Sequence, residues 1–388
     1  MADAVVKSNV VVVGAGPLGL MAALALAKSS HSIILVGPKA PVDGRTTAIL
    51  NEGVSFLEQI GVWDALQTQT APLRIMRLVD GTNRLIRAPE ASFDANELDL
   101  PAFGNNIKNN NLLTVLQKAI NENANIKWYE NLVEGCTLDE TLRLTLDNGT
   151  HVEGSLIVAA DGRGSRLRDA AGIETKKWQY PQTALVMNLK HTRDHQNTST
   201  EFHTETGPFT LVPLLGKQSS LVWVETPEKA AELKTLPLEE LSALISEKSH
   251  YILGDVTVQN QPMAYPLSGL TALEYGRNKV VLIGESAHVF PPIGAQGMNL
   301  GIRDIKVVSE LLEGQTINSP NEVDDLVDDY SVKRKIDISV RTRAIDALNR
   351  SLLTDLLPVH LGRGLGLYAL NNIPSARKFV MRKSLGAR

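Results

Sequence analysis

The sequence predicts an α/β fold in which a parallel βαβ sheet is joined to a second, mainly antiparallel sheet and to helices at the C-terminus. Three observations lead to this prediction. A short β-branched strand runs into three closely spaced glycines and a helix near the N-terminus, alternating strands dominate the middle of the chain, and the residues beyond about 321 are helical in character. The 388 residues are enough for two structural units that share an interface.

The composition excludes some classes of function. A net charge of −4, with 43% hydrophobic and 21% charged residues, is ordinary for a globular enzyme and gives no general attraction to nucleic acid. The single cysteine, Cys136, rules out an internal disulfide framework, and no Cys/His cluster has the spacing of a metal site. We therefore expect a cytoplasmic protein with no metal and no nucleic-acid partner.

The N-terminal glycines have the pattern of a dinucleotide-binding turn. Gly14, Gly16 and Gly19 follow a strand over residues 9–13 and open a helix over residues 18–28. In such a turn the first glycine allows a tight bend, the second lets backbone approach a diphosphate, and the third permits close packing of helix on strand. The helix N-terminus then faces the phosphate charge.

The same stretch is apolar enough to be mistaken for a membrane span or a signal peptide. Residues 10–27 are nearly all apolar, but glycines and a proline at motif spacing interrupt them, and no basic run precedes them. A parallel strand buried on both faces and a helix packed on its sheet both have apolar sequences. We therefore expect a βαβ unit here.

One position departs from the dinucleotide-binding pattern. An acidic residue that binds the ribose hydroxyls is expected about 20 residues beyond the glycines, at the end of the second strand, and Gly37 occupies this place. Asp43 lies nearby, but a loop aspartate is usually just solvated, so we give it little weight. This first motif alone leaves FAD and NAD both open.

The other elements alternate between the two predicted units. Residues 73–87 and three later segments resemble antiparallel strands, whereas a helix over residues 111–121 indicates a return to the first unit. Asp147-Asn148-Gly149-Thr150 has the composition of a hairpin turn. The predicted elements are, in order, strand 32–36, helix 51–60, strands 142–146 and 151–152, strand 156–160, strands 183–189, 209–213 and 220–225, helix 238–247, strand 279–284 and a helix from about residue 298.

Two later motifs narrow the class of protein. Asp161-Gly162-Arg163-Gly164-Ser165 follows one buried strand, with Arg168 a turn later, and Gly284-Glu285-Ser286-Ala287-His288 follows another and leads into a run rich in proline and glycine from Pro291 to Gly301. With the N-terminal glycines, these elements in this order resemble the flavoprotein aromatic hydroxylases of the para-hydroxybenzoate hydroxylase type, over nearly the whole chain. Within that superfamily the chain is most similar to the ubiquinone-biosynthesis hydroxylases, in the run from Pro291 to Asp304, in Arg45-Thr46-Thr47-Ala48-Ile49, and at residues 356–358, 363–367 and 381–386.

This resemblance implies the domain organisation and the reaction. Residues 1–72, 100–178 and 279–320 would form a discontinuous FAD-binding domain of Rossmann-like fold, residues 73–99 and 179–278 a mainly antiparallel substrate domain, and residues 321–388 a C-terminal helical region. FAD, reduced by NAD(P)H or by a protein electron donor, would react with O2 to a C4a-hydroperoxide and pass one oxygen atom to the ring of a polyprenylated phenol. The active site would lie between the first two domains.

The resemblance also implies which residues bind FAD. Glu285, where the family usually has aspartate, would accept hydrogen bonds from the ribityl hydroxyls, and Arg45 would lie between the flavin and the diphosphate. His288 is a weak candidate for the catalytic base, and the alternative is a structural role. The expected cofactor residues are Gly14, Gly16, Gly19, Arg45, Asp161, Gly162, Gly284, Glu285, Pro292, Gly294, Ala295, Gln296, Gly297, Met298 and Asn299.

The C-terminus combines apolar and basic residues. Residues 352–370 are rich in leucine, and no acidic residue follows Asp355, whereas six basic residues do. This composition fits peripheral association with the inner membrane or with a biosynthetic complex, and it equally fits a helix packed on the flavin domain with a solvated basic tail. Two other functions remain open at this point: hydroxylation of a small soluble aromatic compound, and a flavin-binding component of a complex without catalytic activity.

Overall fold

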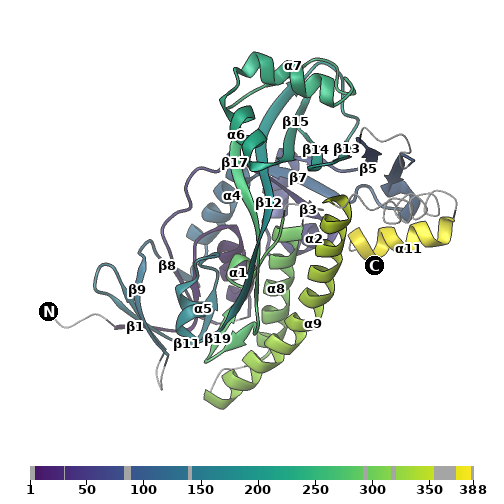
Figure 1. Cartoon of the computed structure of the whole chain (residues 1–388). Coiled ribbons are helices and arrows are strands. Elements are labelled where there is room, and N and C mark those ends of the chain that lie inside the picture. The colour runs from purple at the N-terminus through teal and green to yellow at the C-terminus, as the bar shows by residue number, and fades with distance from the viewer. Residues whose placement is uncertain are drawn as a thin grey trace.

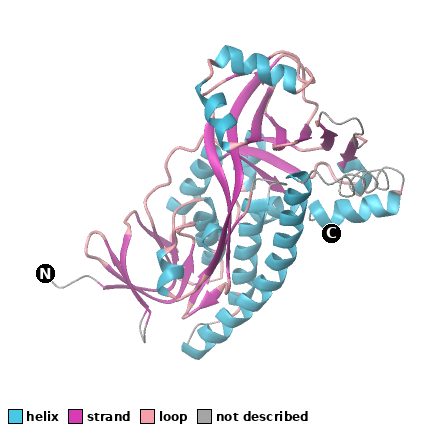
Figure 2. Ribbon diagram, viewed as in Figure 1, coloured by secondary structure: helices cyan, strands magenta, loops and turns pink. Residues whose placement is uncertain are grey.

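A computed structural model of the chain describes residues 5–29, 31–82, 89–138, 142–291, 296–315, 320–353 and 373–385. Two large sheets lie at opposite ends of the molecule, and long helices pack beside the first (Figure 1). Figure 2 shows most strands of the second sheet at the top of the molecule, while its longest strands run down beside the helices. The predicted α/β class is confirmed.

The first sheet contains the N-terminal strand at its centre. β1 pairs in parallel with β11 on one side and with β2 on the other. Farther out, β2 pairs in parallel with β8, and β11 pairs in parallel with β19. β9, β10 and β18 add antiparallel strands, and the predicted turn between β10 and β11 has Gly149 at φ +80°. Its strands are β1 (Val5–Val13), β2 (Ile33–Val36), β8 (Ile126–Tyr129), β9 (Val133–Leu138), β10 (Leu142–Leu146), β11 (His151–Ala159), β18 (Gly276–Arg277) and β19 (Val280–Leu282).

Helices cover this sheet and bury its apolar strands. α1 (Pro17–Ala27) is buried along nearly its whole length and packs against α4 (Asn109–Asn121) and α8 (Gln296–Leu312). α8 in turn contacts α9 (Pro320–Leu353) and α2 (Asn51–Gln59). The apolar stretch at the N-terminus is therefore the core of the first sheet, as predicted, because both faces of β1 are covered.

The second sheet is mainly antiparallel, with the order β20-β17-β12-β15-β14-β13-β5-β6, and β16 pairs with β12. Among the described strands of this second sheet, only β13 and β5 pair in parallel. α6 (Pro227–Thr235) and α7 (Leu238–Lys248) cover one face, which we call the back face. The strands are β5 (Ile75–Asp80), β6 (Ala91–Asp94), β12 (Thr175–His191), β13 (Thr198–Thr204), β14 (Gly207–Leu214), β15 (Gln218–Glu225), β16 (Val256–Val258), β17 (Met263–Ala272) and β20 (His288–Val289).

A small third sheet joins the two large ones. β3 (Thr46–Leu50) and β4 (Thr70–Pro72) pair on either side of β7 (Gly104–Lys108). Its side chains reach the opposite, or front, face of the second sheet, where Thr46 Oγ1 lies 2.8 Å from Ser220 Oγ and Asn106 donates to the carbonyl of Pro213. Short helical turns are α3 (Trp63–Leu66), η1 (Gln67–Gln69), η2 (Ala95–Leu98), α5 (Arg166–Ala170) and η3 (Gly284–Ser286).

The C-terminal region is helical, as predicted, in its described parts. α11 (Pro374–Leu385) packs on η2 at the end of the second sheet (Figure 1). Of the leucine-rich segment over residues 352–370, residues 354–370 lie outside the described residues. No described helix has the length and apolarity needed to span a membrane. The predicted domain division between residues 178 and 179 falls inside β12, so a single strand crosses it.

Candidate functional site

Three turns converge where the parallel strands of the first sheet end. Gly14 follows β1, Asp161 follows β11, and Gly284 follows β19. The strands are held in register by backbone hydrogen bonds from Ala160 to Val13 (2.7 Å) and from Ile283 to Ala159 (3.0 Å). Ligands of open α/β sheets bind at the carboxyl ends of the strands. The structure therefore brings all three sequence motifs to one edge.

The three glycines of the first turn differ in what would surround a side chain at each position. Gly14 has φ +110°, and a Cβ there would lie 2.2 Å from the carbonyl oxygen of Ala160. A Cβ on Gly19 would lie 1.7 Å from the carbonyl oxygen of Gly14, so helix and turn are in close contact. A Cβ on Gly16 would meet no atom within 4 Å. Gly14 and Gly19 are required by packing, whereas Gly16 borders open space.

Gly37 packs against this turn at the place where an acidic residue was expected. A Cβ on Gly37 would lie 2.8 Å from the backbone nitrogen of Ala15, and its φ is +150°. Trp128 Nε1 donates to the Gly37 carbonyl at 2.9 Å. The backbone of Ala15 therefore lies too close to position 37 for a side chain to fit there.

The second turn contains a buried carboxylate with one satisfied oxygen. Asp161 Oδ2 accepts a hydrogen bond from the backbone of Leu167 (3.3 Å), and among the described residues Oδ1 has no partner. Burial raises the pKa of Asp161, although Ser165 and backbone groups act in the opposite direction. A ligand that donates a hydrogen bond to Oδ1 would remove this unfavourable burial.

Two arginines connect the second turn to the third. Arg168 is buried and donates to the carbonyls of Arg163 (3.2 Å) and Ser286 (3.1 Å). Arg163 lies 3.4 Å from Glu285 Oε2 and 3.4 Å from Ser268 Oγ. Glu285 is half exposed, so its carboxylate is accessible to a ligand.

Behind the third turn lies a sealed cluster of charges. Asp304 Oδ2 accepts a hydrogen bond from the backbone of Gly284 (2.8 Å) and lies 2.7 Å from His288 Nε2, while Oδ1 accepts from Arg334 Nε (2.7 Å). Arg334 also contacts Asp337 (2.8 Å). Burial acts to lower the pKa of Arg334, but the charges of Asp304, Tyr330 and Asp337 outweigh it and raise the pKa. We call His288 and Asp304 the sealed pair.

This geometry bears on the candidate base His288. Its side chain is 1% exposed, it stacks on Phe290, and its Nδ1 has no partner among the described residues. The ring thus points at Asp304 in the interior. The structure favours the structural alternative, and a catalytic role for His288 stays a prediction.

Arg45 is held by Asp43, which carried little weight in the sequence-based prediction. Asp43 forms hydrogen bonds with Arg45 Nε (2.9 Å) and Nη2 (2.8 Å), and Asn109 donates to Asp43 at 2.7 Å. The hydrogen bonds with Asp43 raise the pKa of Arg45. Burial acts to raise the pKa of Asp43, but the hydrogen bonds from Arg45 and Asn109 outweigh it and lower that pKa. The guanidinium lies 5.3 Å from the centre of the Tyr265 ring. The expectation that Asp43 is merely a solvated loop residue is therefore wrong. Asp43 orients Arg45.

The start of α8 approaches β3. Asn299 Nδ2 donates to the carbonyl of Ala48 (2.9 Å), and Asn299 Oδ1 accepts from the backbone of Leu50 (2.9 Å). α8 begins at Gln296, Gly297 is exposed with no atom near a Cβ, and Met298 is half buried. The expected residues Pro292, Gly294 and Ala295 lie outside the described residues.

These turns fit a ligand with a diphosphate and several hydroxyl groups. Within the described part of the chain, no side chain caps the N-terminus of α1, so its backbone N–H groups are available to phosphate. Gly16, Gly162 and Gly297 all border open space. Asp161 Oδ1 and Glu285 offer acceptors for hydroxyl groups. FAD has this chemistry, and these residues could hold it.

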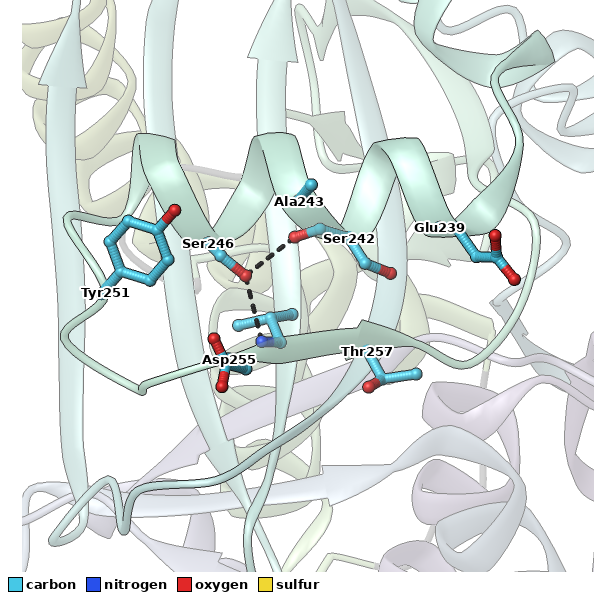
Figure 3. A pocket seen from close by; sticks show the side chains of 8 residues that line it. Glu239, Ser242, Ala243, Ser246, Tyr251, Asp255 and Thr257 are labelled. Carbon is cyan, nitrogen blue, oxygen red and sulfur yellow. Dashed lines mark hydrogen bonds between the residues drawn. The ribbon is translucent and has the colours of Figure 1, made fainter.

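A separate hollow lies between α7 and β16 (Figure 3). The hydroxyl of Ser246 accepts from the backbone of Val256 (3.0 Å), and that of Ser242 from Val258 (3.0 Å). These serines are already used to satisfy the edge of β16. α7 lies at the far end of the molecule from β1 (Figure 1), so this hollow is not the site formed by the three turns.

Sequence reasoning gave Asp43 little weight and missed three further residues that organise the site: Tyr265, Asp304 and Arg334. The only local signal was the Asp43-Gly44-Arg45 spacing, because the other contacts depend on elements that are distant in the chain. No cluster of three or more metal-ligating side chains is found in the part of the chain that the structure describes.

Comparisons with known proteins show the family of the chain. The sequence matches the FAD binding domain family over residues 7–337. It is 30% identical to ubiquinone hydroxylase UbiL of Rhodospirillum rubrum, over 98% of this chain and 90% of that protein. It is 27% identical to 3-demethoxyubiquinol 3-hydroxylase of Escherichia coli, over 98% of both.

Solved structures share the fold. The structure of p-nitrophenol 4-monooxygenase PnpA from Pseudomonas putida DLL-E4 is similar with a TM-score of 0.78 and 19% identity, covering 99% of each chain. PqsL from Pseudomonas aeruginosa, a probable FAD-dependent monooxygenase, has a TM-score of 0.78 and 20% identity, covering 94% of this chain and 100% of that one. The chain belongs to the FAD-binding family of flavoprotein monooxygenases and is an FAD-dependent oxidoreductase that hydroxylates an aromatic ring.

Proposed function

We propose that the protein hydroxylates the ring of a polyprenylated phenol in ubiquinone biosynthesis. The observation that carries the proposal is the convergence of the Gly14, Asp161 and Gly284 turns at one edge of the first sheet. The substrate class is supported by two relatives, named ubiquinone hydroxylase UbiL and 3-demethoxyubiquinol 3-hydroxylase, that match nearly the whole chain.

We assign the cofactor contacts to the residues predicted from the sequence. The first turn and the N-terminus of α1 would hold the diphosphate, Asp161 and Glu285 the hydroxyl groups, and Arg45 the region between diphosphate and ring. Of the residues expected at the flavin ring, Gln296 and Gly297 are described, and they would lie against it at the start of α8, where the positive end of the helix dipole favours negative charge. The first sheet with its helices would be the FAD domain and the second sheet the substrate domain.

FAD, when bound and reduced, supplies the electrons that activate O2. The chain itself contributes orientation and the exclusion of water: Asp43 and Asn109 fix Arg45, Arg168 ties the second turn to the third, and Asp304 fixes Gly284. The reductant would be NAD(P)H or a protein electron donor.

The C-terminus would bring the enzyme to its substrate. On α11, Ser375, Lys378, Phe379 and Arg382 are exposed, and their spacing places them on one face. An exposed aromatic residue between basic ones suits an anionic membrane surface, where a polyprenylated phenol would reside. We therefore place the enzyme in the cytoplasm, peripheral to the inner membrane or to a biosynthetic complex.

The test is a single turnover with labelled oxygen. The FAD-loaded protein is reduced chemically without air and then mixed with ¹⁸O2 and a phenol that carries a short prenyl group. We expect the product to gain one labelled oxygen atom. Product from simple soluble phenols alone would favour a small aromatic substrate, and peroxide without any product would favour a non-catalytic flavin-binding component.

A further inference from the structure

The front face of the second sheet carries a row of partly exposed residues that begins near Arg45. On the back face, cluster residues such as Leu185, Phe202 and Trp223 are buried under α6 and α7. On the front face, five residues that are neighbours across five strands are all half buried. We call this row the front band, and it consists of Met263, Val186, Val222, Thr210 and Glu201.

One end of the front band lies beside Arg45. A Cβ built on Gly44 would lie 3.4 Å from Met263 Cε, and the Arg45 guanidinium faces the ring of Tyr265, two residues along β17. In the neighbouring row of the same face, Asn188 donates to the carbonyl of Gly44 in the loop before β3 (3.1 Å), and Ser220 contacts Thr46 of the small sheet. Four strand spacings of about 4.8 Å carry the band away from this point. The band therefore starts at the cofactor site and runs along the sheet.

The other end of the front band carries a carboxylate and an imidazole. Glu201 Oε1 lies 2.8 Å from His203 Nε2, and Thr210 Oγ1 donates to Glu201 Oε2 at 3.3 Å. The side chain of Glu201 is 18% exposed and that of His203 is 9% exposed. Leu78 pairs opposite Glu201 and packs in a cluster with Met381 of α11, so an apolar wall stands at this end. We call Glu201 and His203 the open pair.

This arrangement suits a substrate with an apolar ring and one hydroxyl group. Val222 and Thr210, next to the open pair, would support the ring, and Val186 and Met263 would support the apolar substituent that points toward Arg45. A phenol is a stronger nucleophile once its hydroxyl is deprotonated, so a hydroxylase benefits from a positioned base. A carboxylate held by two donors, and still partly exposed, can serve as that base.

We propose that Glu201 is the catalytic base that deprotonates the substrate phenol, with His203 and Thr210 as its positioning residues. The phenol O–H bond breaks, its electron pair stays on the phenol oxygen and enriches the ring, and the proton bonds to a carboxylate oxygen of Glu201. The proton later passes to water, so the step is neutral in electrons and needs no further reactant. This inference rests on the proposed function in that the substrate must be a phenol.

The experiment compares Glu201→Gln with Glu225→Gln. Glu225 lies on the back face of the same sheet, where it accepts from Trp223 Nε1 (3.0 Å), so it provides a matched control for the change of carboxylate to amide. The probe is ortho-prenylphenol, added to the oxidised FAD-loaded protein without turnover. Formation of the phenolate is followed by its ultraviolet difference band, and hydroxylation is then measured in a single turnover.

We expect the phenolate band in the wild type and in Glu225→Gln, and no band in Glu201→Gln although the phenol still binds. Hydroxylation by Glu201→Gln should fall by about 10² to 10⁴. A ring-fluorinated ortho-prenylphenol, already ionised in the buffer, should restore most of the rate. Glu201→Asp should keep part of the activity because the carboxylate remains.

Two results would overturn the proposal: a phenolate band of wild-type size in Glu201→Gln, or an equal loss of rate on the fluorinated phenol, which would make Glu201 a structural residue. Failure of the proposed function has a different signature, because the wild type itself would then hydroxylate neither phenol.

Discussion

Two pairs of a carboxylate and an imidazole lie in different parts of the molecule, with almost equal separations and opposite surroundings. In the sealed pair, His288 and Asp304 are 2.7 Å apart and are 1% and 0% exposed. In the open pair, His203 and Glu201 are 2.8 Å apart, and the carboxylate is partly exposed on the front band. The comparison teaches that the distance between such groups does not identify a catalytic base, because access to a substrate decides what the pair can do.

The sealed pair is tied to the backbone of the cofactor site. Asp304 of α8 joins two segments that are distant in the sequence, namely the run from Gly284 to His288 and Arg334 of α9. The buried ion pair of Asp304 with Arg334 is costly to break, since removal of one partner leaves an uncompensated charge in the interior. In the open pair, Glu201 has two side-chain donors among the described residues and remains partly exposed, so loss of this pair should cost the fold less.

The largest expected effect tests the sealed pair. Asp304→Asn should lower the free energy of unfolding of the FAD-free protein by about 3–5 kcal/mol, because Arg334 is left buried with a weaker partner. Urea unfolding measures this. The control is Asp337→Asn, which alters the other partner of Arg334 at a more exposed position. An equal effect of the two substitutions would show that the sealed pair has no special structural role.

The next effect separates packing from binding in the cofactor turn. Gly16→Val places a side chain in open space, so the FAD-free protein should keep its stability while FAD affinity falls by about a hundredfold, or about 2.7 kcal/mol. Gly19→Val should lose both stability and FAD affinity, because its Cβ would overlap the carbonyl of Gly14. Titration of the FAD-free protein with FAD, with unfolding measured in parallel, checks this. Full FAD affinity in Gly16→Val would refute the assignment of this turn to the diphosphate.

The smallest effect concerns the wall at the end of the open pair. Arg377 of α11 hydrogen bonds to Glu97 Oε2 (2.6 Å) and to the carbonyl of Ser92, and it holds the pKa of Glu97 below the usual 4.5. A carboxyl group whose pKa is lower in the folded than in the unfolded state stabilises the fold at pH values above its unfolded pKa. This contribution is lost as the pH falls through its folded pKa.

The corresponding variant is Glu97→Gln. Near neutral pH it should lower the free energy of unfolding by at most about 1 kcal/mol, since the pair is partly exposed. The difference from the wild type should shrink as the pH falls below about 4.5 and through the folded pKa of Glu97. Unfolding curves at several pH values measure it. A difference that does not change with pH would mean that the charge of Glu97 does not hold α11.

The cofactor side of the molecule was predictable because its signals are local. The glycines, the Asp161 turn and the Gly284 turn each directly follow a strand of branched or apolar residues, and parallel strands end at one edge. Their spacing in the sequence was therefore enough to place them together. The exception is Asp43, whose contact with Arg45 depends on the path of the loop and on Asn109 of α4.

The substrate side was not predictable in the same way. Whether Glu201 faces the cofactor site or the back face depends on the register of β13 with β14, and a shift of one residue would reverse it. The role of Asp304 depends on α9, which follows in the chain and gives no local sign of its contact. Single-sequence patterns do not contain such long-range registers.

The division of roles between the two pairs can be tested in one paired measurement. The free energy of unfolding and the single-turnover hydroxylation rate of ortho-prenylphenol are measured for Glu201→Gln and Asp304→Asn, both saturated with FAD. We predict that Glu201→Gln keeps the wild-type stability and loses the rate, whereas Asp304→Asn loses stability and its folded, FAD-loaded fraction keeps most of the rate. The reverse pattern, or a common loss of stability in both variants, would contradict this account.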